Sequence, residues 1–196
     1  IAVDPNQLVL EALRLAADDA QLLASGKVAL VDGSNFALRG SLQKFDPSRF
    51  ARLPAARLDA DFEAQGSRAP QLALSLRFQL HHSRLGSEAL SGNGEVELAG
   101  KRLRKADVEL TAAGNRLSAK GAFGAVGDQL TVAIAAPRLD PLGVVGDVDG
   151  RIVLGGSFQS PEVSADLHST RLALPRFGQL RGLALAARLG DGSRGA

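Results

Sequence analysis

The chain has 196 residues and a formal net charge of +2, and it contains no Cys, Trp, Tyr or Met. Without cysteine, a disulfide framework and a cysteine-based metal site are excluded. A charge so close to balance argues against nucleic-acid binding, which favours a basic stripe. Hydrophobic residues make up 45% of the chain and aromatic residues only 4%. The apolar surface is therefore mostly aliphatic, which suits aliphatic ligands better than stacked bases or protein hot spots.

The N-terminal stretch permits two interpretations. Pro5 could occupy the first position of a helix. Leu8 and Leu10 alternate with other residues, however, and Asp18–Asp19 is typical of a turn. We therefore predict strand in preference to helix over residues 5–25.

Strand signals then follow one another along the chain, with no helical period between them. In Arg57–Ala64, apolar and charged residues alternate, which indicates a strand with one buried face. Glycine-containing breakers such as Ser91–Gly94 and Gly124–Asp128 separate later strands about every dozen residues. This spacing predicts an all-β fold of hairpins and meanders rather than βαβ units.

The apolar residues at every second position define one continuous stripe. Gly121 falls in this stripe, where its missing side chain could help the sheet to curl. The positions predicted to line a hydrophobic groove are Leu72, Leu74, Leu76, Phe78, Val96, Leu98, Val108, Leu110, Leu117, Phe123, Leu130, Val132, Ile134, Ile152, Leu154, Phe158, Val163, Leu167, Leu172 and Leu174.

Candidate catalytic and metal-binding groups are few. His81 and His82 are neighbours on a predicted strand, so their side chains should point to opposite faces and could not easily share a metal ion. The carboxylates of Asp59, Asp61 and Glu63 share one outward face, whereas acid–base catalysis needs carboxylates in unlike environments. No nucleophile elbow, phosphate-binding loop or dinucleotide turn occurs. We predict no enzyme activity, no catalytic residue, no metal site and no cofactor.

Several motifs, in their order, resemble a known family. The stretch "LSAKGAFG", followed by "DQLTVAIAAPRLDPL" and "GRIVLGGSFQSPEVSADL", is similar to the C-terminal region of TamB, the inner-membrane subunit of the translocation and assembly module. TamB belongs with the AsmA-like (DUF490) proteins. The resemblance covers roughly residues 22–189. It matches least over residues 1–21.

The resemblance implies a fold, a role and partners. It implies one long, curled, antiparallel or mixed sheet, a U-shaped β-taco trough with an aliphatic inner face. It also implies a non-enzymatic module of outer-membrane biogenesis, whose groove serves phospholipid transport, assembly of outer-membrane proteins such as autotransporters, or both. The expected partners are lipid acyl chains or nascent outer-membrane protein strands, and an Omp85-type (TamA-like) outer-membrane barrel. The expected location is a periplasmic segment of an inner-membrane-anchored protein in a Gram-negative bacterium.

Other architectures share the alternating pattern. A β-solenoid or stalk would have a filled core and a regular repeat, but no fixed period is visible. An outer-membrane barrel would carry girdles of Trp and Tyr, and the chain has neither residue. Because the first residue is Ile1 and no signal peptide appears, we interpret residues 1–196 as a single segment of a longer repeat protein. Its exposed sheet edges could self-associate.

Overall fold

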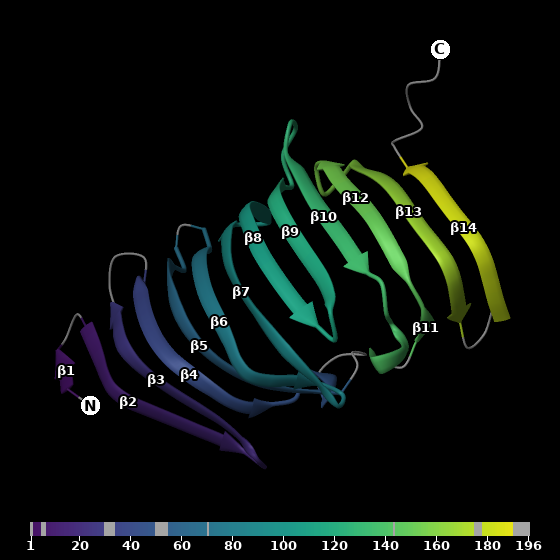
Figure 1. Ribbon diagram of the computed structural model, residues 1–196. Helices are drawn as coiled ribbons and strands as arrows, with labels where there is room; N and C mark the ends of the chain where they lie inside the picture. The colour runs from purple at the N-terminus through teal and green to yellow at the C-terminus, as the bar shows by residue number, and fades with distance from the viewer. Residues whose placement is uncertain are drawn as a thin grey trace. The chain divides into compact units, whose positions relative to one another are not determined.

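The computed structural model describes residues 2–4, 7–29, 34–49, 55–69, 71–142, 144–174 and 178–189. Within these residues the structure consists of β-strands and two short 3-10 turns, so the all-β prediction is confirmed. The chain divides into two compact units, residues 1–100 and residues 101–196. Figure 1 labels the strands of both units. We describe each unit by itself.

Unit 1 is an antiparallel meander in which each strand pairs with the next along the chain. Its strands are β1 (Ala2–Asp4), β2 (Gln7–Ala17), β3 (Ala20–Ala29), β4 (Phe36–Phe45), β5 (Ala56–Ser67), β6 (Ala73–Leu85) and β7 (Glu88–Ala99). β2 and β3 form a hairpin around Asp18–Asp19, which confirms the strand prediction over the described residues 7–25. A 3-10 turn, Pro47–Arg49, follows β4.

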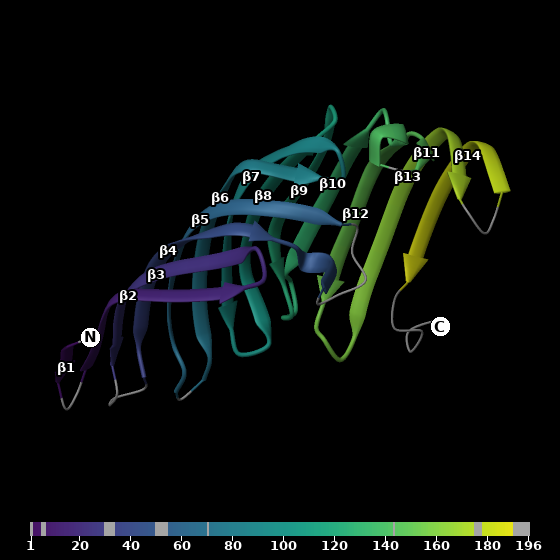
Figure 2. The ribbon, with the colours of Figure 1, turned by 90° about the horizontal axis from the view of Figure 1, so that it is seen from below.

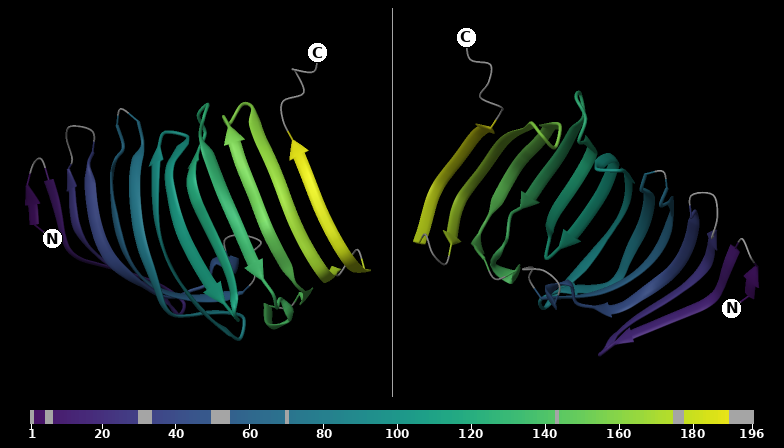
Figure 3. Two further views of the ribbon diagram at one scale, coloured as in Figure 1. Left: turned by 45° about the horizontal axis from the view of Figure 1, so that its top comes forward. Right: turned by 180° about the vertical axis from the view of Figure 1, so that it is seen from behind.

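Unit 2 is also an open antiparallel sheet (Figure 3). Its strands are β8 (Arg102–Ala112), β9 (Asn115–Phe123), β10 (Gln129–Ala136), β11 (Val145–Gly146), β12 (Val148–Gly156), β13 (Pro161–Leu174) and β14 (Gly178–Leu189). A 3-10 turn, Asp140–Leu142, precedes β11. The long strand β13 pairs with β12, with β11 and with β14.

β-Bulges interrupt the strand pairing at corresponding places in alternate strands. In each bulge two residues of one strand oppose a single residue of its neighbour, which locally bends the strand. In unit 1 the bulged pairs are Glu11–Ala12 in β2, Gln43–Lys44 in β4 and His81–His82 in β6. In unit 2, Arg104–Lys105 of β8 forms a further bulge.

The bulges of unit 1 coincide with a bend in its strands (Figure 2). Register places each bulged pair on the polar face of the sheet; Gln43–Lys44, for example, opposes Asp59 of β5. The extra residue lengthens the strand on that side, so the strand bends away from it. The apolar face of unit 1 therefore lies on the inside of the bend.

No second layer of helix or sheet covers either unit in the described residues. The chain exposes 13,045 Å² of surface, whereas a folded monomer of 20.3 kDa exposes about 8,800 Å². The buried apolar side chains in the described residues are mostly alanines, and none of the large side chains there is fully buried. The apolar face of each sheet is thus a half-exposed surface rather than a filled core.

One glycine-containing segment differs from the prediction. Ser91–Gly94 is not a turn but lies inside β7, where Gly92 and Gly94 oppose the bulky Leu80 and Phe78 of β6. The turn before β7 lies instead at Gly86. Each of these two glycines pairs with a large residue of β6. β7 therefore continues through a segment whose glycine content predicts a turn.

Gly121 does lie on the apolar face, as predicted, but its absent side chain has a more local role. Its φ of +126° is one that L side chains rarely adopt, and an added Cβ would lie 2.0 Å from the carbonyl oxygen of Gln129. Glycine at this position therefore lets the backbones of β9 and β10 approach.

Candidate functional site

The apolar face of unit 1 consists of rows that cross the strands. Register aligns side chains on one face of β2 through β7, and these rows contain aliphatic side chains, phenylalanine and glycine but no ionisable group. One row is Leu10, Gly26, Leu38, Ala64, Leu76 and Val96. The next is Leu13, Ala24, Gly40, Phe62, Phe78 and Gly94.

Unit 2 repeats this arrangement from β8 to β14. One row is Ala106, Gly121, Leu130, Leu154, Val163 and Leu189. The next is Val108, Ala119, Val132, Ile152, Ala165 and Ala187, and a third is Leu110, Leu117, Ile134, Gly150, Leu167 and Leu185. Most of the large side chains in these rows are half-buried, so they present hydrocarbon to whatever lies against the sheet.

The structure places most of the predicted groove residues on these two apolar faces. Leu74 and Leu98 pair across β6 and β7, and Phe123 packs its ring against Phe158 with centroids 5.0 Å apart. Leu72 lies just before β6 and is exposed. Leu174 belongs to β13, but its side chain lies outside the described part of the chain.

Leu172 reaches the apolar face through an irregularity in β13. Asp147 accepts hydrogen bonds from the backbone N–H groups of Thr170 and Arg171, at 2.8 and 3.1 Å. Two successive residues of β13, Thr170 and Arg171, therefore donate to the same carboxylate. Beyond them, the side chains that point to the apolar face are displaced by one position along the strand. Leu172 pairs with Gly146 and is buried.

The predicted groove list omitted the N-terminal strands. Leu38 of β4 lies in the row of Leu76, and Phe62 of β5 lies in the row of Phe78. Leu42 of β4 lies in the row of Leu80. The alternation in Phe36–Leu42 and in Arg57–Ala64 is a signal that could have found them. Leu13 could not be found in this way, because the bulge after Leu10 makes it the next residue on the apolar face of β2. Strict alternation would place Ala12 there instead.

The hollows of both units lie on the opposite, polar face. In unit 1 two adjacent hollows of about 780 and 640 Å³ share Ser25, Arg39, Glu63 and Arg77. In unit 2 a hollow of about 570 Å³ is lined by residues of β9, β10, β12 and β13, including Arg116 and His168. Long charged side chains form the walls of these hollows, so their chemistry differs from that of the apolar rows.

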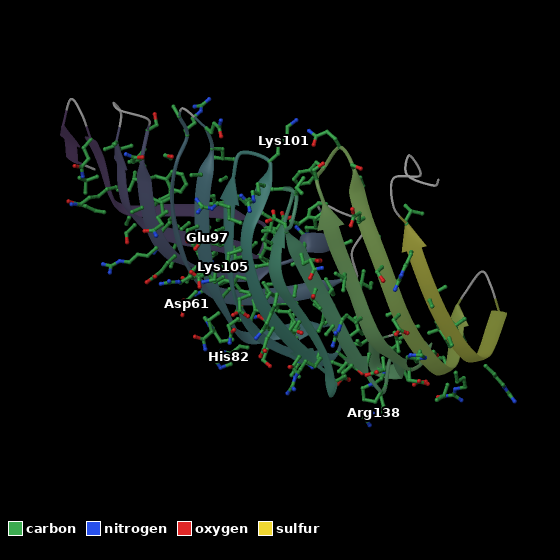
Figure 4. All side chains as sticks on the ribbon, turned by 90° about the horizontal axis from the view of Figure 1, so that it is seen from above. Asp61, His82, Glu97, Lys101, Lys105 and Arg138 are labelled. Atoms are coloured by element: carbon green, nitrogen blue, oxygen red, sulfur yellow. The ribbon has the colours of Figure 1, made fainter. Side chains whose placement is uncertain are left out.

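Ion pairs dominate the polar face. Arg77 of β6 donates to Glu95, its cross-strand neighbour in β7, at 3.2 Å. The Lys120 ammonium lies 3.4 Å from Asp107 and 3.5 Å from Glu109, and the nearby Asp107 charge chiefly raises the pKa of Lys120. Apart from the half-buried Glu95, these groups are exposed. Such pairs stabilise a sheet only modestly. Asp61 and Glu97 mark this face of unit 1 in Figure 4.

The prediction for His81 and His82 was wrong in its geometry. The bulge and the left-handed backbone of His82 (φ 53°) break the alternation, and the two rings meet edge to face with centroids 5.8 Å apart. Nδ1 of His81 also lies 3.8 Å from Oδ2 of Asp61. Even so, no group of three or more potential metal ligands gathers in the described residues.

Perturbed carboxyl groups act as clamps at strand ends. Hydrogen bonds from Arg102 chiefly lower the pKa of Asp128, and those from Ser48 and Thr170 lower the pKa of Asp46 and Asp147 respectively. Each carboxylate also accepts from backbone N–H groups of its own turn or of a neighbouring strand. These contacts hold loops and bulges and do not converge on a reaction site.

A comparison with protein families identifies the chain. The model of the family described as "TamB, N-terminal domain" matches residues 3–192. The chain belongs to the TamB family. Comparisons with curated proteins and with solved structures gave no match.

The TamB match refines the expectation drawn from the motifs. It is to the model of the N-terminal domain, whereas the motifs were assigned to the C-terminal region, and neither that region nor the AsmA-like grouping is confirmed. Among the described residues of this TamB-family chain, the helical segments are too short and too polar to cross a lipid bilayer.

Proposed function

We propose that this TamB-family chain is a non-enzymatic module of outer-membrane biogenesis that holds phospholipid acyl chains against the apolar faces of its two sheets. The observation that carries the proposal is the row pattern. In each unit, aliphatic residues from five or six strands lie side by side, half-exposed and without an ionisable group among them.

The energetics of lipid transfer favour such a surface. Exposing hydrocarbon to water costs about 0.8 kcal/mol per methylene, so an acyl chain of about fifteen methylenes costs roughly 12 kcal/mol. A carrier lowers this cost by replacing water with continuous apolar surface, and it needs no specific contact. The half-exposed rows provide that surface, whereas a stalk with a filled core would bury its large side chains, and the described residues bury few of them.

Location and partners follow from this role. We place the chain in the periplasm of a Gram-negative bacterium, as part of an inner-membrane-anchored protein that meets an Omp85-type, TamA-like outer-membrane barrel. Nascent strands of outer-membrane proteins, including autotransporters, are the second candidate cargo. The outer edge of β14, which pairs with β13 on its other side, would suit strand addition.

Photocrosslinking tests whether lipid lies on the apolar face. A photoreactive amino acid would replace Val132, which belongs to an apolar row, or Ala133, its neighbour in β10 on the polar face. Both residues are half-buried, so the pair differs mainly in the face that it reports. After irradiation in cells, mass spectrometry of the purified chain should find lipid adducts at position 132 and few at position 133.

Two results would count against acyl-chain binding. Equal labelling at the two positions would indicate nonspecific contact with lipid. Peptide adducts at position 132 without lipid adducts would favour nascent protein strands as the cargo.

A further inference from the structure

One end of unit 2 gathers exposed apolar side chains. Val126 is 94% exposed, Leu189 70% and Phe158 50%. They come from the turn between β9 and β10, the end of β14 and the turn between β12 and β13. Antiparallel pairing brings these segments to the same end of the sheet, at the top of unit 2 in Figure 1. We call Val126, Phe158 and Leu189 the apolar tip.

Hydrogen bonds and packing fix the tip in its exposed position. The N–H of Asp128 donates to the carbonyl of Ala125 at 3.1 Å, and the Asp128 carboxylate accepts from the Ala125 N–H at 2.9 Å. Phe158 packs beside Gly124, where an added Cβ would lie 2.7 Å from the phenyl ring. Val126 therefore projects from a closed turn.

The apolar tip is continuous with the apolar face of the unit. The row nearest this end runs through Ala106, Gly121, Leu130, Leu154 and Val163 and ends at Leu189, which belongs to the tip. Phe158 contacts Phe123, which pairs with Leu103 on the same face. A hydrocarbon chain that entered at the tip would meet apolar side chains all the way to the rows.

The charges around the tip suit a phospholipid surface. Arg102 and Asp128 form an ion pair and so neutralise each other. Lys101, Arg188 and Glu162 are exposed at the same end, two of them basic and one acidic. Apolar side chains flanked by Lys and Arg are typical of segments that lie in a bilayer interface.

We propose that the apolar tip inserts into the headgroup region of a phospholipid bilayer, where acyl chains pass between the bilayer and the apolar face of unit 2. The passage of acyl chains rests on the function proposed above, whereas the docking of the tip does not.

Tryptophan fluorescence tests the docking directly, because the chain has no Trp of its own. Val126→Trp places the probe at the tip. Val145→Trp is the matched control, because Val145 is also an exposed valine of unit 2 but lies in β11, at the other end of the sheet. With phosphatidylethanolamine–phosphatidylglycerol vesicles, the emission of the Val126→Trp chain should shift to the blue. Lipids with a quencher near the acyl chains should quench it, and both effects should be absent for Val145→Trp.

A charge at the tip should weaken binding. Val126→Asp changes a side chain that is almost fully exposed in the free chain, so the fold should be retained. Vesicle affinity should fall roughly tenfold or more, because the bilayer no longer buries a valine at this position. Unchanged emission of Val126→Trp with vesicles, or equal shifts for both probes, would overturn the proposal. Docking of the tip without lipid adducts at Val132 would contradict the proposed lipid-holding function but not the docking proposal. Lipid adducts at Val132 without docking of the tip would contradict the docking proposal but not the lipid-holding function.

Discussion

The guanidinium of Arg102 donates two hydrogen bonds to the carboxylate of Asp128, from Nε at 2.9 Å and from Nη2 at 2.6 Å. Arg102 begins β8, whereas Asp128 ends the turn between β9 and β10. The pair therefore links two hairpins of unit 2 through one carboxylate, which also accepts from the Ala125 N–H.

Acid should destabilise unit 2 by protonating this carboxylate. The hydrogen bonds from Arg102 hold the pKa of Asp128 below its ordinary value of 3.8. A depressed pKa in the folded state stabilises the fold above the unfolded-state value, and this stability is lost as the pH falls below 3.8 toward the folded-state pKa. Urea unfolding followed by circular dichroism should show stability falling below about pH 4, and Asp128→Asn should flatten that fall. An identical slope in the variant would contradict the assignment.

Asn115 should stabilise the loop after β10. It is buried, its amide donates to the carbonyl of Arg138 at 2.6 Å, and its Oδ1 accepts from the Arg138 N–H at 3.0 Å. Asn115→Ala leaves two backbone groups without partners, so the free energy of unfolding should fall by about 1–3 kcal/mol. Asn93→Ala, at an exposed position of β7, is the control and should change it by less than about 0.5 kcal/mol. Equal effects in denaturant titrations would argue against the Asn115 clamp.

Gly121 should tolerate no side chain. Gly121→Ala places a methyl group 2.0 Å from the Gln129 carbonyl oxygen at an unfavourable φ, so β9 and β10 must separate. We expect a loss of about 1–3 kcal/mol or more in thermal or urea unfolding. Gly114→Ala also requires a positive φ but meets no atom within 4 Å, so its cost should be smaller. A larger loss for Gly114→Ala would show that φ strain, and not strand approach, explains the effect.

Leu110→Arg should separate folding from lipid holding. Leu110 is half-buried, so the arginine can extend its guanidinium into water, and the loss of stability should stay near 1 kcal/mol. A fully buried leucine would lose about 2–5 kcal/mol on truncation alone. Lipid adducts at Val132 should nevertheless decrease, because a charge enters the apolar surface. Unfolding of the variant would instead indicate a closed core.

Alternation alone predicted the strands and the composition of the apolar face. It worked from Leu74 to Leu80 and from Val96 to Leu98, because side chains on a regular strand alternate and only one face is apolar. It failed at His81–His82, where a bulge removes the alternation, and at Ser91–Gly94, where glycine occurs without a turn. Bulges depend on the neighbouring strand, so a local pattern cannot reveal them.

The contacts between Arg102 and Asp128 and between Asn115 and Arg138 could not be predicted from the sequence either. Arg102 and Asp128 are 26 positions apart, and Asn115 and Arg138 are 23 apart. The local sequence around each of these residues does not indicate its partner, because the pairing depends on which hairpin ends lie side by side in the fold. The exposure of Val126 was likewise not predicted, since "GAVGD" was interpreted only as a turn.

The bulges also bear on how a protein of this kind could grow. They occur in β2, β4, β6 and β8, so from β2 to β8 every second strand carries one. A hairpin of one bulged and one regular strand is then the smallest piece that can be duplicated or deleted without disturbing its neighbours' registers. Changes in length during evolution should therefore occur in steps of two strands, whereas the gain or loss of a single strand would reverse the direction of every strand that follows.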